Sequence, residues 1–252
     1  MNSPPELKKQ VVMASLFTGT YDVNRNEILT SDDFELVKAW ADSVQKARLQ
    51  GIIFHNGFSE ETCEKHQNEN LIFIRTQPST SFNPNIFRYF LYLDFLKKAG
   101  SQISDIFLTD ISDVVLIRNP FEESHYLENP KSIFCGDEPK TLENEWMKDH
   151  STHLRSQIPD FEIYEKNFAN KPLLNCGVIG GKSKLMMDFL TRLCAIHQSH
   201  NHENKSAFTG DMGAFNYLIR TQFQNQILHG FPINTVFKEY QSDREDCWFR
   251  HK

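Results

Sequence analysis

Two aspartates, Asp110 and Asp113, interrupt the apolar stretch of residues 106–116, which reads Ile-Phe-Leu-Thr-Asp-Ile-Ser-Asp-Val-Val-Leu. The apolar run predicts a buried strand. A carboxylate is costly to bury unless a cation or a hydrogen-bond donor pairs with it. Open α/β sheets bind their ligands beyond the carboxyl ends of strands, so the two acids are candidate ligands of a metal ion. The alternative is that Asp110 ends the strand and Asp113 begins a turn.

The elements that must position these acids alternate between apolar runs and helical patterns, which predicts a mostly parallel sheet with helices on both faces. Strands are predicted at residues 11–17, 52–55, 71–74 and 106–116. Helices are predicted to begin at residues 30–33 and to stop at Gly51, to occupy residues 59–67, and to run from Asn83-Pro84 to Gly100.

The second half of the chain is less regular. Residues 132–136 and 173–181 predict strands, and further helices are predicted from about residue 185 and from residue 209. Residues 137–171 are polar, with one helix predicted at 142–154 and few apolar anchors, so we expect a mobile insertion over a site. Short strands and loops are expected from residue 227 onward, where Trp248 and Phe249 should be buried and hold the neighbouring His251 against the protein.

Composition excludes several classes of protein. The chain has 252 residues and a net charge of −6, so a nucleic-acid groove is not expected. Its five cysteines are an odd number without C-x-x-C spacing, which indicates neither a disulfide framework nor a zinc site. It has no run of about 18 apolar residues and no signal-peptide pattern, so we expect a cytoplasmic protein without a membrane span; the alternative is that the chain is one domain of a longer protein.

Other residues could bind a ligand near the acids. Ser15, Phe17, Thr18 and Gly19 end the first strand, where a nucleotide is often contacted in such sheets, although G-x-G-x-x-G and G-K-[ST] motifs are absent. Arg88, with Tyr92 one turn later, could hold phosphate or sugar hydroxyls; the alternative is a surface ion pair.

Histidines are a weaker signal. His197, His200 and His202 end a helix in a polar stretch, and we expect them in solvent rather than around a metal.

Four motifs together resemble glycosyltransferases of the GT-A fold. The first is D-x-x-D at residues 110–113, a variant of the DxD motif, followed by Val-Val and Asn-Pro-Phe at 119–121. The second is Asn-Cys-Gly-Val-Ile-Gly-Gly at 175–181, and the third is Gly-Asp-Met-Gly-Ala-Phe-Asn at 210–216, similar to the D-Q-x-x-x-N helix start of glycogenin-like retaining enzymes. The fourth is a late histidine, His229 or His251. Two departures are the wider spacing of the acids and Met212 in place of glutamine.

The resemblance implies a single α/β domain of GT-A type, with a mostly parallel central sheet and a smaller acceptor-side sheet. Residues 1–118 would bind the nucleotide and residues 119–252 the acceptor. It also implies transfer of a sugar from a UDP- or GDP-linked donor to a hydroxyl of a glycan or glycoprotein, with Mn²⁺ or Mg²⁺. The implied metal ligands are Asp110, Asp113 and His251. The implied donor contacts are Ser15, Phe17, Thr18, Gly19, Arg88, Asp110, Asn175 and Gly177.

The implied catalytic acids are Asp211 and Asp137, the latter with Glu138 beside it. Asp211 could instead be a first-turn acid that favours the helix dipole, and His229 could be structural. Two other functions remain open: a carbohydrate-binding protein on the same fold that has lost turnover, and a metal-dependent phosphohydrolase.

Overall fold

A seven-strand sheet forms the centre of the protein. The computed structural model describes residues 5–19, 21–22, 27–79, 81–200 and 210–252. The strands lie in the order β10-β8-β9-β6-β1-β4-β5, and only β9 runs antiparallel to its neighbours. They are β1 (Gln10–Leu16), β4 (Gln50–His55), β5 (Leu71–Arg75), β6 (Asp105–Thr109), β8 (Ile133–Thr141), β9 (Pro172–Lys182) and β10 (Ile227–His229). The prediction of a mostly parallel sheet is therefore confirmed.

Two small antiparallel ladders accompany this sheet. One pairs β7 (Val114–Leu116) with β11 (Phe249–His251), and the other pairs β2 (Tyr21–Asp22) with β3 (Glu27–Ile28). The prediction of one strand over residues 106–116 is wrong, because β6 ends at Thr109 and β7 belongs to a different sheet. Both acids lie in the connection between these strands.

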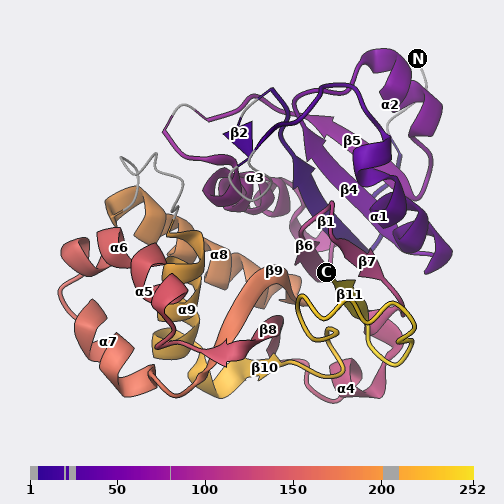
Figure 1. Ribbon diagram of the computed structural model, residues 1–252. Coiled ribbons are helices and arrows are strands. Elements are labelled where there is room, and N and C mark those ends of the chain that lie inside the picture. The colour runs from indigo at the N-terminus through magenta and orange to yellow at the C-terminus, as the bar shows by residue number, and fades with distance from the viewer. Residues whose placement is uncertain (1–4, 20, 23–26, 80, 201–209) are drawn as a thin grey trace.

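Helices cover both faces of the central sheet (Figure 1). Those described are α1 (Glu35–Lys46), α2 (Glu60–His66), α3 (Pro84–Ala99), α4 (Ser124–Leu127), α5 (Glu145–His150), α6 (Thr152–Gln157), α7 (Phe161–Phe168), α8 (Ser183–His200) and α9 (Asp211–Gln222). Side chains of β1 alternate between the two apolar cores: Val11 and Met13 pack with α3, α8 and α9, whereas Val12 and Ala14 pack with α1. This alternation is the period-two pattern of a strand buried on both faces.

The first helix differs from its prediction at both ends. It begins at Glu35, later than residues 30–33, and ends at Lys46, with Arg48 at a positive φ of 60°. Gly51 is therefore no helix stop and lies inside β4. A Cβ atom there would approach the Trp40 ring to 3.0 Å, so the glycine lets α1 pack closely on the sheet. By contrast, the predicted start and end of α3 are confirmed: the Asn83 side chain accepts from Ile86 N, and Gly100 follows the last turn.

Residues 137–171 are more ordered than their composition indicates. Strand β8 continues to Thr141, and three helices follow where one was predicted. The buried apolar side chains of these helices and of the residues that connect them are Leu142, Met147, Leu154, Ile158, Phe161 and Tyr164. Phe161 stacks on Tyr217 of α9 with ring centroids 5.3 Å apart. The expectation of few apolar anchors is wrong, because widely spaced apolar residues on three short helices still build one packed face.

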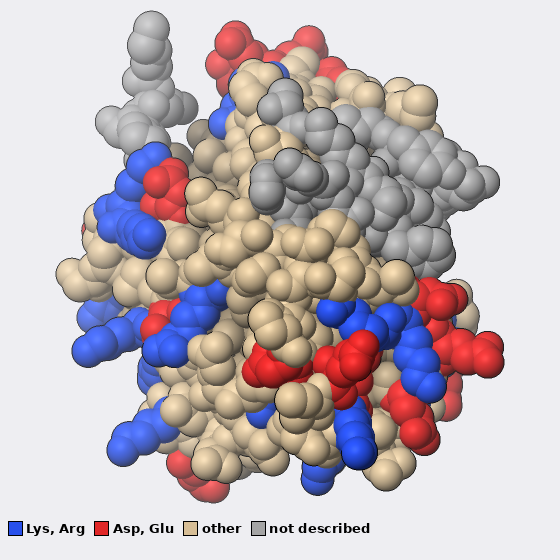
Figure 2. Space-filling model, turned by 90° about the vertical axis from the view of Figure 1, so that its left-hand side faces the viewer, with Lys and Arg blue, Asp and Glu red and all other residues tan. Residues whose placement is uncertain are grey.

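The surface carries charges of both signs. On the face shown in Figure 2, acidic and basic side chains lie interspersed. Within the part of the chain that the structure describes, no helix has both the length and the apolar character needed to cross a bilayer.

Candidate functional site

The candidate site lies where the chain changes direction across the sheet. Strand β1 pairs with β4 on one side and with β6 on the other, with Met13 opposite Leu108. After β5 the chain crosses back to β6, so loops leaving β1 and β6 diverge at their carboxyl ends. Such a switch point is where open α/β sheets bind ligands. Gly19, at a φ of +69°, follows β1, and Asp110 follows β6.

Helix α1 fixes the strands that flank the acidic connection. The Trp40 indole N–H donates to Thr109 Oγ1 at 2.7 Å, at the last residue of β6. The Ser43 hydroxyl accepts from Leu116 N at 3.1 Å, at the last residue of β7. The connection that carries the two acids is therefore held at both ends by one helix.

Asp110, Asp113 and His251 come together at this edge of the sheet. His251 Nε2 lies 3.8 Å from Asp110 Oδ2 and 3.7 Å from Asp113 Oδ2, and one ligand atom from each residue lies within 4.8 Å of the others. These separations are too long for hydrogen bonds. They suit ligands of one ion, because ligands about 2.1 Å from a Mg²⁺-sized cation lie about 3 to 4.2 Å apart. Two carboxylates and an imidazole also form a donor set that Mn²⁺ accepts.

The C-terminal strand delivers His251 to the acids. In β11, His251 lies opposite Val114 of β7, and Lys252 N donates to Asp113 O at 3.0 Å. The His251 amide donates to Thr235 Oγ1 at 3.1 Å, and its side chain is 1% exposed. Trp248 and Phe249 are buried, so the prediction that they hold this end of the chain is confirmed.

Arg88 lies behind Asp110. Its Nη1 donates to Asp110 Oδ1, and its Nη2 donates to Tyr89 Oη at 3.2 Å and to Cys176 Sγ at 3.6 Å. Burial by itself lowers the pKa of Arg88, but interactions with Tyr89 and Asp110 outweigh it and raise the pKa well above its usual value. The alternative of a surface ion pair is wrong, because the arginine is buried. Asp110 thus gives one oxygen to Arg88 and turns the other toward His251.

Strand β9 bends around the cluster. Its register against β8 shifts between Cys135 opposite Ile179 and Gly136 opposite Asn175, an irregularity of the kind common near binding sites. Gly177 O accepts from Asp110 N at 2.8 Å, and the Asn175 side chain accepts from Gly177 N at 2.7 Å. A Cβ atom on Gly177 would lie 2.4 Å from His251 Cε1 and 2.6 Å from Asp110 Oδ2. Glycine is therefore required for the cluster to close.

The predicted residues at the end of β1 contact the turn after β4 and helix α3, which carries Arg88. Thr18 is buried, and its amide donates to Asn56 Oδ1 at 2.8 Å. Phe17 packs on Phe87, the residue before Arg88, with centroids 5.8 Å apart. Burial raises the pKa of Tyr92 to about 12, against smaller lowering effects of Arg88 and of the Ser15 hydroxyl.

The two predicted catalytic acids lie in separate places. Asp211, in the first turn of α9, is 3.1 Å from His150 Nε2 and accepts from the Cys176 thiol at 3.8 Å. Asp137, in the middle of β8, is instead 2.8 Å from Nδ1 of His229, the last residue of β10. His229 is thus paired with an acid away from the metal cluster, and His251 is the late histidine that joins it.

The expectation of solvated histidines is wrong for His197. Its side chain is fully buried and stacks on Tyr89, with ring centroids 6.1 Å apart. His200 is half-buried at the end of α8, and His202 and Thr209 lie outside the described residues. The helical spacing of α8 indicates that His197 is buried, because His197 follows Leu193 by four positions and therefore lies on the same buried face.

Burial of His197 has a consequence for stability. It lowers the pKa of His197 to about 4, an effect that the Asp211 charge partly opposes. An unfolded histidine binds a proton below about pH 6.5, so the unfolding free energy should fall as pH decreases from about 6.5 to 4. In a His197→Phe variant, the unfolding free energy measured with urea should fall less than in the wild type over this pH range. The difference between the two falls should be at most about 3 kcal/mol. The buried His55, whose pKa is also lowered to about 4, leaves a residual dependence. An unchanged profile would contradict the assignment.

Sequence reasoning missed several residues that shape the site. Tyr89, Cys176, His150 and Thr235 all contact its members, yet none carries a motif of its own. Two of them are sequence neighbours of predicted site residues, which is the one indication of their role: Cys176 lies between Asn175 and Gly177, and Tyr89 follows Arg88.

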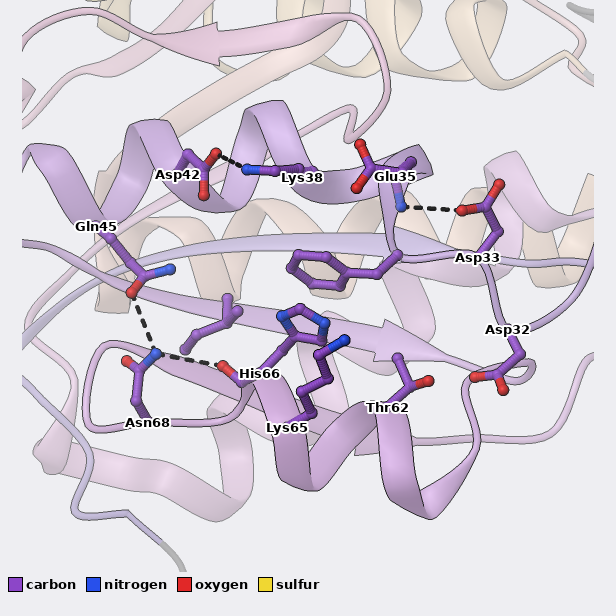
Figure 3. A pocket seen from close by; sticks show the side chains of 12 residues that line it. Asp32, Asp33, Glu35, Lys38, Asp42, Gln45, Thr62, Lys65, His66 and Asn68 are labelled. Carbon is purple, nitrogen blue, oxygen red and sulfur yellow. Dashed lines mark hydrogen bonds and ion pairs between the residues drawn. The ribbon is translucent and has the colours of Figure 1, made fainter.

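Two surface hollows contain no member of the metal cluster. One, of about 450 Å³, lies between α1 and α2 (Figure 3). There His66 stacks on Phe34 with centroids 3.7 Å apart, and Lys38 pairs with Asp42 at 2.5 Å. The other, of about 460 Å³, is lined by residues of α5, α6 and α7, among them the ion pair between Arg155 and Glu165.

No family model matches this sequence, and comparison with curated proteins gives no match. The observed facts are therefore an α/β protein with a mixed seven-strand sheet and a candidate metal centre of Asp110, Asp113 and His251.

Proposed function

We propose that the protein is a metal-dependent glycosyltransferase of GT-A type, which moves a sugar from a nucleoside diphosphate, UDP or GDP, to a hydroxyl of a glycan or another acceptor. The observation that carries this proposal is the convergence of Asp110, Asp113 and His251 at the switch point of the sheet. A nucleotide bound there would place its phosphates beside the three ligands.

The three residues would provide different ligand atoms to the ion. Asp110 and Asp113 supply hard oxygen ligands, and the buried His251 supplies a nitrogen on a fixed strand. When bound, Mn²⁺ or Mg²⁺ would neutralise the charge that develops on the departing diphosphate. Arg88 fixes the orientation of Asp110 from behind, as residues outside a metal's own ligand set commonly do.

The remaining donor contacts are assigned by their position. Gly19 and Thr18 would meet the nucleotide at the end of β1, and Gly177 would let the donor sugar approach the backbone. Asp211 is buried and accepts from the Cys176 thiol, which itself accepts from Arg88. We assign it to the donor sugar rather than to a freely accessible acceptor.

Ligand-dependent stability tests this function directly. A panel of UDP- and GDP-sugars is added to the protein with Mn²⁺ and, separately, with EDTA. At a hundred times its dissociation constant, the true donor should raise the unfolding free energy by about 2.7 kcal/mol, and only with the metal. Slow metal-dependent hydrolysis of that donor would then separate an enzyme from a carbohydrate-binding protein. Stabilisation by no nucleotide sugar, together with phosphate release from simple phosphoesters, would favour a phosphohydrolase instead.

A further inference from the structure

A second polar pair lies outside the metal cluster and joins Asp137, in the middle of β8, to His229, at the carboxyl end of β10. His229 Nδ1 is 2.8 Å from Asp137 Oδ2, and the two side chains are 27% and 29% exposed. Another histidine–aspartate pair, His150 with Asp211, is only 9% exposed at each member. Of these two pairs, the Asp137–His229 pair is the one that a large acceptor molecule can reach.

The pair lies on the same edge of the sheet as the metal cluster. Moving from Asp110, the next strand is β9 at Gly177, then β8 at Gly136, then β10 at His229. Neighbouring strands lie about 4.8 Å apart, so the two strand steps alone separate Asp137 from Asp110 by about 10 Å, and the shift from Gly177 to Leu174 along β9 adds to this distance. That distance leaves room for a sugar ring between the metal-bound diphosphate and the pair.

Two consecutive residues, Asn234 and Thr235, connect the Asp137–His229 pair with the metal cluster. The Asn234 side chain donates to Asp137 O at 3.3 Å, and the next residue, Thr235, accepts from the His251 amide at 3.1 Å. Gly230 has a φ of +73°, and a Cβ atom there would lie 2.7 Å from Asp137 Oδ2. The carboxylate is therefore closely enclosed on this side.

The contact with Asp137 fixes the orientation and the tautomer of the His229 imidazole. A carboxylate accepts from the Nδ1–H of a neutral histidine, which makes Nε2 a hydrogen-bond acceptor. Two residues further on, Phe231 is 61% exposed, and the Arg244 guanidinium lies 5.0 Å from its ring centroid. An acceptor nitrogen, an aromatic ring and a cation suit a molecule with hydroxyl groups and apolar C–H faces.

Building on the proposed transferase function, we propose that Asp137, His229 and Phe231 form an acceptor subsite for a saccharide. His229 Nε2 accepts a hydrogen bond from a hydroxyl of that saccharide, and Phe231 stacks on its ring. Asp137 is a positioning residue, which acts by fixing the orientation and tautomer of His229.

The test separates donor binding from transfer. The variants are His229→Ala, Asp137→Asn and Phe231→Ala, with His66→Ala in the α1–α2 hollow as the matched control. Donor binding is measured as stabilisation by the nucleotide sugar with Mn²⁺. Transfer is measured to p-nitrophenyl glycosides of glucose, galactose, mannose and xylose.

The three variants should bind donor as the wild type does and lose transfer efficiency by about 10- to 100-fold. The loss should appear mainly in KM for the glycoside. Asp137→Asn should resemble His229→Ala, because an amide N–H facing Nδ1 would favour the other tautomer.

Three results would overturn the proposal: unchanged transfer in the variants, loss of donor binding in parallel with transfer, or transfer to none of the glycosides by a protein that binds donor. Failure of the wild type to bind any nucleotide sugar would instead count against the transferase function itself.

Discussion

Replacing Asp113 by alanine should abolish metal-dependent turnover of the nucleotide sugar while the fold survives. Asp113 Oδ2 lies 3.7 Å from His251 Nε2, inside the span of one coordination sphere. Loss of residues that only support metal ligands already costs 10- to 100-fold, so removing a ligand should cost at least about 100-fold. Because the Asp113 side chain is 42% exposed, the melting temperature in EDTA should change little.

The control for this experiment is Asp243→Ala, which removes an exposed acid from the loop before β11. It alters the net charge equally and should keep wild-type turnover. Wild-type turnover in Asp113→Ala, at limiting Mn²⁺, would show that the aspartate is no ligand.

Replacing Arg88 by methionine should destabilise the metal-free protein by about 3 kcal/mol. Removing one member of a buried ion pair costs about 3 to 5 kcal/mol, and the lower end applies because Asp110 is 32% exposed. Tyr89 and Cys176 would also lose their contacts with the guanidinium. Adding Mn²⁺ should recover part of the loss, since the ion restores a cation beside Asp110. Urea unfolding with EDTA and with Mn²⁺ measures both effects.

Arg88→Lys is the matched variant. It keeps the charge but loses the planar fork that contacts three groups at once, so its stability should fall between those of the wild type and Arg88→Met. Equal stability of Arg88→Met and the wild type in EDTA would contradict the role assigned to the ion pair.

Much of the fold follows from local patterns. Five of the apolar runs, at residues 11–17, 52–55, 71–74, 132–136 and 173–181, became central strands near their predicted positions, and the caps at Asn83 and Gly100 delimit α3. The errors have a physical cause. Gly51 resembles a helix stop but serves close packing against Trp40, and the short helices of residues 145–168 bury apolar residues too widely spaced for one long helix.

The site could be predicted only in part. Asp110 and Asp113 carry a signal because acids interrupt an apolar run, and His251 was indicated by the neighbouring aromatics. The contacts of Arg88 with Cys176, and of Asp137 with His229, join residues far apart in sequence. They depend on the strand order and on the irregular register of β9, which no local pattern encodes.

Titration of Mn²⁺ followed by electron paramagnetic resonance tests the central claim most directly. The signal of free Mn²⁺ should fall by one ion per chain for the wild type, and UDP or GDP should tighten that binding. Asp113→Ala and His251→Ala should leave the ion free at the same concentrations. Absence of binding by the wild type with either nucleotide, or equal binding by both variants, would contradict a metal centre formed by Asp110, Asp113 and His251.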